Sequence, residues 1–299
     1  MSGKIFIDDI VYHPTFNCNL SCRGCVNYSN HLETRKIPDE SNWARDLDIL
    51  FSRFEVNHIE IAGGETLMFP HLQDLIKRLA PVKKYIITTN GLLLHKNMWI
   101  RDLLDSDTRF DLQISVHGHP LQESVYIKTL CENIELLLGI PSSKFKKLLR
   151  LHYLSEHVSG EAFNVYNSRV HIKIHHKGNW AYPLLDKDEL PMLFNNNKED
   201  AYKRCICPSM HIKNGKIYKC PMTAMLPSVL DSKGIHDSKW QFIRDYVPYN
   251  LLEEHNSDSW ATLRIAEDIC TRCPYSAQEW DRTKTDLHSK IVFGESVLK

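Results

Sequence analysis

Three cysteines stand close together near the N-terminus, in the stretch Asn17-Cys18-Asn19-Leu20-Ser21-Cys22-Arg23-Gly24-Cys25. Their C-x3-C-x2-C spacing offers three thiolates from one loop. Thiolates hold iron–sulfur clusters, and a cubane with three protein ligands leaves one iron open for chemistry. The alternative is a zinc knuckle, which needs a fourth protein ligand at short spacing, and none follows Cys25 closely. We therefore expect Cys18, Cys22 and Cys25 to bind a [4Fe–4S] cluster.

A second group of cysteines lies beyond residue 200: Cys205, Cys207, Cys220, Cys270 and Cys273. Four thiolates from this group would hold either a second [4Fe–4S] cluster or a structural zinc ion, and the residues alone leave both open. Either Cys205 or Cys207 ligates. The one left over is an inert thiol or, as a hypothesis, a hydrogen-atom donor that faces the substrate.

The ninth cysteine, Cys131, lies on the apolar stripe of an expected helix, so we expect it to be a small buried core residue. Nine cysteines in a chain without an export signal favour metal or redox use over disulfides.

The charge balance and the hydropathy of the chain limit its possible partners and its location in the cell. The chain has 299 residues with 37 Lys and Arg against 37 Asp and Glu, so no basic surplus favours a nucleic-acid partner. No apolar stretch is long enough for a membrane helix, and the N-terminus runs into Asp8 and Asp9 instead of a signal sequence. We expect a cytoplasmic protein without a membrane partner.

Strand-like and helix-like runs alternate up to about residue 175, the pattern of parallel βα units. Apolar residues at helical spacing predict helices around 43–54, 72–79 and 127–138. Gly215 fits a tight turn before the short β-like piece Lys216–Tyr218. The expected strands are Ile10–Tyr12, His58–Ala62, Lys84–Thr89, Phe110–Val116, Lys147–Tyr153 and Arg169–His175.

Three more motifs follow the cysteine triplet: Ala62-Gly63-Gly64-Glu65-Thr66, Thr89-Asn90-Gly91 and Ile114-Ser115-Val116-His117-Gly118. Each comes at the end of an expected strand. With the triplet, they make the chain similar to the radical S-adenosylmethionine (SAM) superfamily. The C-terminal cysteines resemble the shortened "twitch" form of the SPASM domain, in which four cysteines hold an auxiliary [4Fe–4S] cluster.

The resemblance implies an α/β fold with a partial (β/α)6 TIM-like barrel. The barrel would occupy residues 1–175, followed by a connection at 176–204, the auxiliary-cluster domain at 205–275 and a tail at 276–299. Its cluster ligands would be Cys205, Cys220, Cys270 and Cys273. Without the resemblance, Gly63 and Gly64 are ordinary turn residues, Ser115 a satisfied strand-end hydroxyl and Asn90 part of an Asn-Gly turn.

The resemblance also implies site roles and an activity. Gly63 and Gly64 would let the backbone approach the methionine part of SAM, Glu65 would accept from its ammonium group, and Ser115 would lie near its ribose, with Asn90 a further contact. A reduced cluster would cleave SAM and remove a hydrogen atom from an unactivated C–H, with flavodoxin or ferredoxin as electron donor.

For the substrate we expect a small polar, sugar-like or cyclitol-like molecule that is oxidised or epimerised. Two alternatives stay open: a maturase that modifies a peptide, and a non-catalytic iron–sulfur sensor. Only the sensor predicts no SAM cleavage in the presence of a reductant.

Overall fold

The structure is a computed structural model, and the residues it describes are 4–22, 25, 27–29, 42–117, 121, 124–154, 162–174, 177–180, 190, 193–203, 205, 209–253, 263–273 and 278–281. No helix among these residues is long and apolar enough to cross a membrane. Cys207, Gly118 and His175 lie outside them, as does the expected tail at 276–299 except for residues 278–281.

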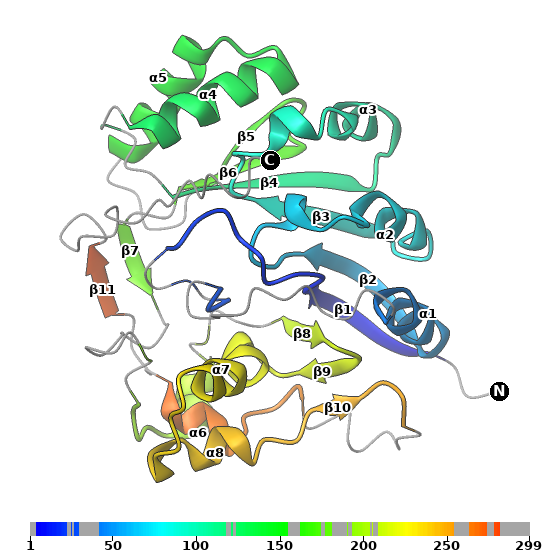
Figure 1. The fold of residues 1–299 in the computed structure, drawn as a ribbon, viewed down its shortest axis with the longest axis vertical. Coiled ribbons are helices and arrows are strands. Elements are labelled where there is room, and N and C mark those ends of the chain that lie inside the picture. The colour runs from blue at the N-terminus through cyan, green and yellow to red at the C-terminus, as the bar shows by residue number, and fades with distance from the viewer. Residues whose placement is uncertain are drawn as a thin grey trace.

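The centre of the fold is a nine-stranded sheet with the order β10-β9-β8-β1-β2-β3-β4-β6-β5 (Figure 1). The strands from β8 to β6 in this order run parallel, while β5, β9 and β10 pair antiparallel with their neighbours. A separate pair joins β7 (Lys177–Trp180) to β11 (Gln278–Asp281). The strands of the large sheet are β1 (Ile5–Tyr12), β2 (Phe54–Ile61), β3 (Lys84–Thr89), β4 (Phe110–Val116), β5 (Ala162–Val165), β6 (Val170–Ile174), β8 (Met210–Lys213), β9 (Lys216–Tyr218) and β10 (Tyr249–Asn250).

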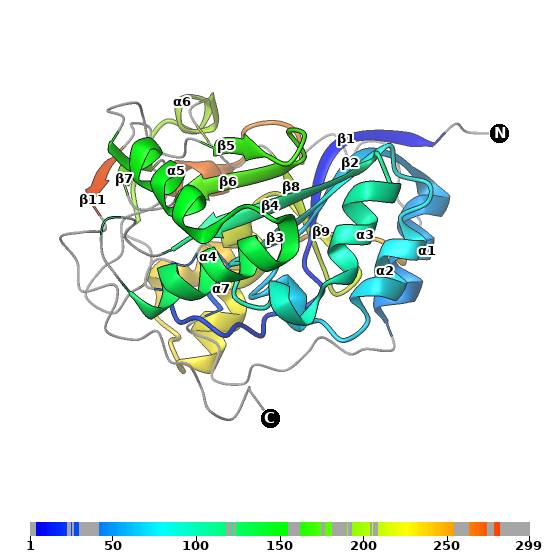
Figure 2. The same ribbon diagram turned by 90° about the horizontal axis from the view of Figure 1, so that it is seen from above.

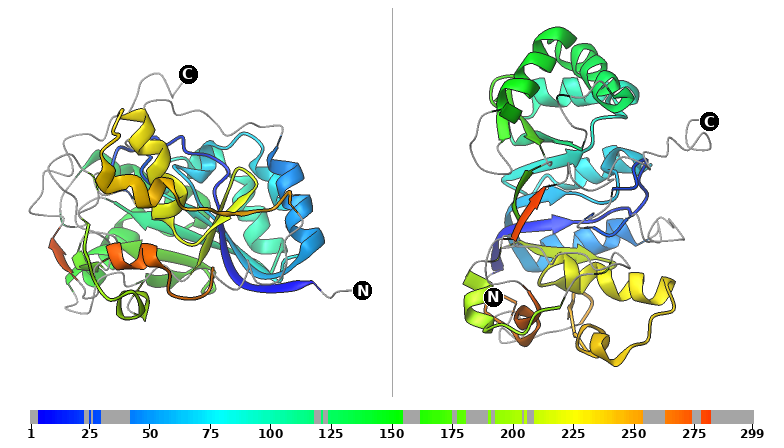
Figure 3. Two further views of the ribbon diagram at one scale, coloured as in Figure 1. Left: turned by 90° about the horizontal axis from the view of Figure 1, so that it is seen from below. Right: turned by 90° about the vertical axis from the view of Figure 1, so that its left-hand side faces the viewer.

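Helices connect the parallel strands and cover one face of the sheet, as Figure 2 shows for α1 to α3. In Figure 3 the green α4–α5 pair and the yellow α7–α8 pair lie at opposite ends of the molecule. The α-helices are α1 (Trp43–Arg53), α2 (Leu72–Arg78), α3 (Trp99–Ser106), α4 (Val125–Leu138), α5 (Ser142–Leu154), α6 (Lys198–Lys203), α7 (Pro221–Ser232) and α8 (Gln241–Arg244). The short 3-10 helices are η1 (Thr66–Met68), η2 (Leu94–Lys96), η3 (Ser238–Trp240) and η4 (Asp268–Arg272).

The α/β class is confirmed, and the sheet is open: within the described residues its edge strands β10 and β5 do not pair with each other. The partial (β/α)6 barrel stays a prediction. Strands β3 and β4 have the expected bounds, while β1 and β2 begin several residues earlier than expected. The β8–β10 segment continues the sheet beside β1 (Figure 1). The division of the chain into a barrel, a connection and an appendage is not tested by this and stays a prediction.

One expected strand is wrong. Residues 147–153 belong to helix α5, which buries Phe145, Leu149 and Tyr153. These three follow one another at four-residue spacing, which places them on one face of a helix. Helix α5 packs against α4, and Phe145 and Leu149 belong to the main core. Cys131, on α4, is only 3% exposed and belongs to the main core, so its prediction as a core residue is confirmed.

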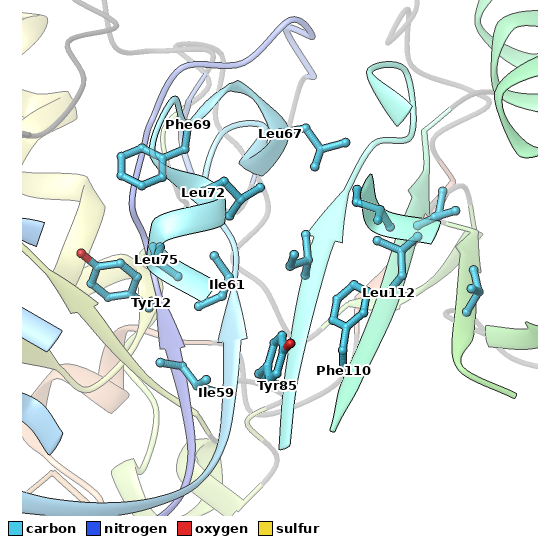
Figure 4. Close-up of a cluster of buried hydrophobic side chains, with 14 of the residues drawn as sticks. Tyr12, Ile59, Ile61, Leu67, Phe69, Leu72, Leu75, Tyr85, Phe110 and Leu112 are labelled. Atoms are coloured by element: carbon cyan, nitrogen blue, oxygen red, sulfur yellow. The ribbon is translucent and has the colours of Figure 1, made fainter. Parts of the chain in front are cut away.

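The two faces of the parallel sheet differ in chemistry. Because side chains alternate along a strand, residues paired across neighbouring strands share a face. One face carries Tyr12, Ile61, Tyr85 and Phe110, which pack under the helices with Leu72 and Leu75 (Figure 4). The other face, here called the polar face, carries Asp9, His58, Glu60, Thr88, Asp111, Gln113, Ser115, His171, Lys173, His211 and Lys213.

The hairpin of β8 and β9 turns at Asn214 and Gly215, which both have positive φ (50° and 68°). Two-residue turns of this kind match the twist of the paired strands, so the expected tight turn at Gly215 is confirmed. A Cβ at Gly215 would lie 3.1 Å from a carboxylate oxygen of Asp46 on α1. Burial raises the pKa of Asp46. The hairpin is thus docked against the first turn of α1.

Candidate functional site

The cysteine loop leaves the sheet at the carboxyl end of β1. Cys18 is buried, whereas Cys22 and Cys25 are half-buried. Backbone hydrogen bonds from Cys25 to Cys22 and from Tyr28 to Cys25 curl the loop. Burial raises the pKa of the Cys18 thiol, and negative charge on Glu65, Cys25 and Cys22 raises it further. The three thiols and the Glu65 carboxylate therefore share one electrostatic environment.

Gly63 and Gly64 allow the loop after β2 to lie against the chain that leads to Cys18. A Cβ on Gly63 would lie 2.4 Å from the carbonyl oxygen of Thr15, and one on Gly64 would lie 2.3 Å from that of Asn17. Backbone hydrogen bonds join Gly64 N to Thr15 O (3.0 Å) and Glu65 N to Asn17 O (2.7 Å). These glycines are needed for close contact between two backbones of the same chain.

Glu65 is 1% exposed and joins the ends of β2 and β3. Its Oε1 accepts from the Thr89 hydroxyl (2.6 Å) and from Leu67 N (3.0 Å), and its Oε2 accepts from Asn90 N (2.8 Å). Burial raises the pKa of this carboxyl, while the three hydrogen bonds oppose the rise. A carboxylate offers about four acceptor positions, so Glu65 keeps room for one further donor.

Two asparagines that the sequence reasoning missed, Asn19 and Asn27, hold the cysteine loop against the ends of β2 and β3. Asn27 Nδ2 donates to the Gly63 carbonyl (2.6 Å), and Asn90 Nδ2 donates to Asn19 Oδ1 (2.7 Å). Their positions, between and just after the cysteines, were the only signal in the sequence. Short amides beside a ligand loop suit this task because they hydrogen-bond to backbone and to one another.

Tyr126, on α4, was also missed, and it joins the ends of β3 and β4. Its hydroxyl lies 3.0 Å from the Asn90 carbonyl and 3.2 Å from the Ser115 carbonyl, and it accepts from His117 N (3.1 Å). Burial raises the pKa of this phenol. Asn90 and Ser115 thus lie at the same edge of the sheet and share a partner, which no pattern in the sequence indicates.

These residues fit a thiolate-bound cluster with a ligand beside it. Within the described residues, no three His, Cys, Asp or Glu side chains are arranged to hold a single metal ion. A cubane differs from a single ion, because its irons and sulfides fill the space between the thiolates. Three thiols from one loop, next to a buried carboxylate with spare acceptor capacity, match that donor set.

The cysteines of the second group, Cys205, Cys220, Cys270 and Cys273, also influence one another. Burial raises the pKa of Cys273, and repulsion from Cys220, Cys205 and Cys270 adds to the rise. Burial likewise raises the pKa of Cys220, to about 11. Helix α7 begins directly after Cys220. Four thiols from three segments therefore lie within electrostatic reach of one another, and Cys207 lies outside the described residues.

Lys219, beside Cys220, anchors the segment that leads to the last two cysteines. It is 5% exposed, and its Nζ donates to the carbonyls of Leu263 (3.1 Å) and Ile265 and lies 3.3 Å from Glu267 Oε1. Asn196 donates from Nδ2 to the Cys273 carbonyl (2.8 Å). Neither residue was foreseen, since both act through backbone carbonyls far away in the sequence.

A second hydrophobic core links the two cysteine groups. It contains Phe16 and Tyr28 from the N-terminal loop together with Met222, Trp240 and Cys270 from the C-terminal part. The residues before and after Cys18, Cys22 and Cys25 therefore pack against the segments that carry the second group.

Comparison with known proteins agrees with this geometry over the N-terminal part. Residues 12–120 match the family model described as "Radical SAM superfamily". A "Probable GTP 3′,8-cyclase" of Methanococcus aeolicus is 26% identical over 128 residues, 41% of this chain and 41% of that protein. Another of that name, from Methanosarcina mazei, is 33% identical over 85 residues, 27% of this chain and 25% of that protein. The matched part thus spans about two fifths and one quarter of these relatives. The stretch from residue 12 to residue 120 is a radical SAM domain.

Proposed function

We propose that the protein is a radical SAM enzyme in which Cys18, Cys22 and Cys25 hold a [4Fe–4S] cluster. The observation that carries the proposal is the convergence of the cysteine loop, Glu65, Asn90 and Ser115 at the carboxyl edge of β1 to β4. In open α/β sheets this edge is where ligands bind. When bound, the reduced cluster and SAM supply a radical that removes a hydrogen atom from an unactivated C–H.

The chain's own residues would bind and orient SAM. We assign the remaining acceptor position of Glu65 to the ammonium group of SAM, since a buried carboxylate suits a cationic donor. Gly63 and Gly64 bring the Glu65 backbone against the cysteine loop, which positions the carboxylate beside Cys18. Ser115 and Asn90, held by Tyr126, would contact the remainder of the cofactor.

We also propose that Cys205, Cys220, Cys270 and Cys273 hold an auxiliary [4Fe–4S] cluster in a twitch-like arrangement. The mutual repulsion of these four thiols supports a shared site. A zinc ion is the alternative. The unused thiol at 205 or 207 stays a candidate hydrogen donor.

Two substrate classes follow from different observations. The polar face below Ser115 favours a small hydroxylated substrate, such as a sugar or cyclitol that is oxidised or epimerised. The name of the two relatives favours a guanine nucleotide that is cyclised. A peptide substrate has no supporting observation here. The reductant would be a flavodoxin or ferredoxin, and the proposed location is the cytoplasm.

Anaerobic reconstitution tests the cluster assignments. We expect about eight irons per wild-type chain, about four in a Cys18/Cys22/Cys25 triple Ala variant and about four in Cys220→Ala, since a cubane holds four irons. Cys131→Ala is the matched control and should keep the wild-type iron content. Four irons in the wild type, or zinc bound in place of iron, would contradict the assignment of an auxiliary [4Fe–4S] cluster.

Cleavage of SAM separates an enzyme from a sensor. With dithionite and no substrate, the wild type should release 5′-deoxyadenosine and the triple Ala variant should release none. Absence of 5′-deoxyadenosine from a fully loaded wild type would favour the sensor. Incubation with GTP or with a cyclitol, followed by mass spectrometry of the products, distinguishes the two substrate classes.

A further inference from the structure

The polar face carries three carboxylates, and one of them differs from the others. Asp9 lies 2.5 Å from His58, and Asp111 lies 2.7 Å from Lys84 and 3.1 Å from His171. Glu60 has no cationic partner among the described residues. Its hydrogen bond is to the Thr88 hydroxyl, which donates to Oε1 at 2.6 Å. A half-buried carboxylate without a counter-charge is costly unless donors reach it.

Glu60 is held in a fixed orientation by hydrogen bonds across three strands. The row of Glu60 on β2, Thr88 on β3 and Gln113 on β4 is here called the track. Gln113 Nε2 donates to the Thr88 hydroxyl at 3.1 Å, and Thr88 donates to Glu60. Thr88 and Gln113 are direct partners in the register of β3 and β4. Within the described residues, Glu60 Oε2 and Gln113 Oε1 have no hydrogen-bond partner. The track therefore presents two acceptor oxygens from the same face.

His13 adds an independent sign of an unfilled position on this face. It follows β1, is 2% exposed, and its Nε2 lies 2.7 Å from Nδ1 of His211. Its own Nδ1 is buried and has no partner in the described part of the chain. Native proteins rarely leave such a buried atom unsatisfied. Ala62, which follows β2, donates from its backbone N–H to the carbonyl of Tyr12, the residue before His13 (3.0 Å).

The distance between the track and the residues assigned to SAM leaves room for a substrate. Ser115 lies two residues beyond Gln113 on β4, and a strand rises about 3.3 Å per residue, so the two side chains lie about 7 Å apart along the strand. A ring bound to the track would thus lie directly below the residues assigned to SAM. This step rests on the proposed function.

We propose that Glu60, oriented by Thr88 and Gln113, is the substrate-binding carboxylate of this protein and takes two adjacent N–H or O–H donors. A vicinal diol of a sugar-like or cyclitol ring offers such a pair, and so does the N1–H and amino edge of guanine. Both place two donors against one carboxylate, as bidentate pairing requires.

The test is calorimetric titration of the anaerobic holoenzyme with GTP, ITP and myo-inositol. Glu60→Gln keeps an acceptor for the Thr88 hydroxyl but puts an amide N–H₂ donor where Oε2 of Glu60 stands. The affinity for the bound probe should therefore fall about 10- to 100-fold. Glu60→Asp keeps the charge but withdraws it by one methylene, and we expect an intermediate loss. Glu55→Gln is the control, because Glu55 is an exposed residue on the same strand.

The probes separate the two sources of donors. If the guanine edge binds, wild type should prefer GTP to ITP, which lacks the amino group, and Glu60→Gln should lose the preference. If a diol binds, myo-inositol should bind wild type about 10- to 100-fold more tightly than Glu60→Gln. Binding of no probe to wild type, or equal binding to wild type and Glu60→Gln, would overturn the proposal. Release of 5′-deoxyadenosine without substrate should be the same in all variants, and its loss in wild type would instead count against the proposed function.

Discussion

Replacing Gly64 by alanine would test whether the glycine pair is needed for contact between backbones of the same chain. The added Cβ would lie 2.3 Å from Asn17 O and 2.5 Å from Phe16 O. Both atoms are backbone, so no side chain can rotate away. The cysteine loop must move by about 1 Å to restore ordinary contact. That movement strains the bond from Glu65 N to Asn17 O at 2.7 Å.

The cost has two parts. Forcing an extra methyl into a packed site costs about 1–3 kcal/mol, and each weakened hydrogen bond adds about 0.5–1.5 kcal/mol. We expect Gly64→Ala to lose about 2–5 kcal/mol of unfolding free energy, which lowers the Tm by about 3–8 °C in a chain of this size. Since Asn17 directly precedes Cys18, iron loading should fall as well.

Thermal unfolding of the iron-free protein, followed by circular dichroism, is the assay. Gly139→Ala is the control: Gly139 ends α4 at φ +69°, and no atom of the described residues lies within 4 Å of the added Cβ. Its cost is the left-handed backbone alone, about 1 kcal/mol. If Gly64→Ala destabilises the protein no more than Gly139→Ala, the close approach between the two loops is not as described.

Three further changes test other parts of the frame. Asn27→Ala removes the bond to Gly63 O, so it should lower the iron content after reconstitution at limiting iron, as measured by a colorimetric iron assay. Tyr126→Phe leaves three backbone groups without their shared hydroxyl and should cost about 1–3 kcal/mol in chemical unfolding, with weaker SAM binding in equilibrium dialysis. Asp46→Asn tests a buried acid whose folded pKa is raised. The native state then binds this proton more tightly than the unfolded state, so wild-type stability should fall relative to Asp46→Asn as pH rises from about 4 through the folded pKa; a difference that is constant with pH in urea unfolding would contradict this.

The sequence predicted the elements whose patterns are local. Strand β4 alternates apolar and polar residues from Phe110 to Val116, as a strand with one buried face should, and the structure gives it those bounds. The strand predicted at 147–153 was wrong because the apolar residues Leu148, Leu149 and Leu151 resemble a strand. The four-residue spacing of Phe145, Leu149 and Tyr153 is helical, and it is this spacing that the structure follows. A short window hides that longer period.

The site was predictable in its motifs but not in its connections. Cysteine spacing and strand-end glycines are readable because their chemistry is carried by residue type. Asn27, Tyr126 and Lys219 act by bonding to carbonyl oxygens 11 to 46 positions away, and any polar side chain has that capacity. Only the folded chain shows which carbonyl each one reaches.

The structure also indicates why the two cysteine groups are held in one molecule. Lys213, on β8, donates to the Ala224 carbonyl (2.9 Å) and to Ser228 Oγ (2.8 Å) in α7, and its ammonium lies 5.0 Å from the ring centre of Phe16. Burial lowers the pKa of this amine to about 8. Lys213 thus contacts both the chain before Cys18 and the helix that starts after Cys220. A shift of α7 would therefore be transmitted to the first cysteine loop through packed and hydrogen-bonded atoms, which makes the C-terminal segment part of the frame around the radical SAM domain.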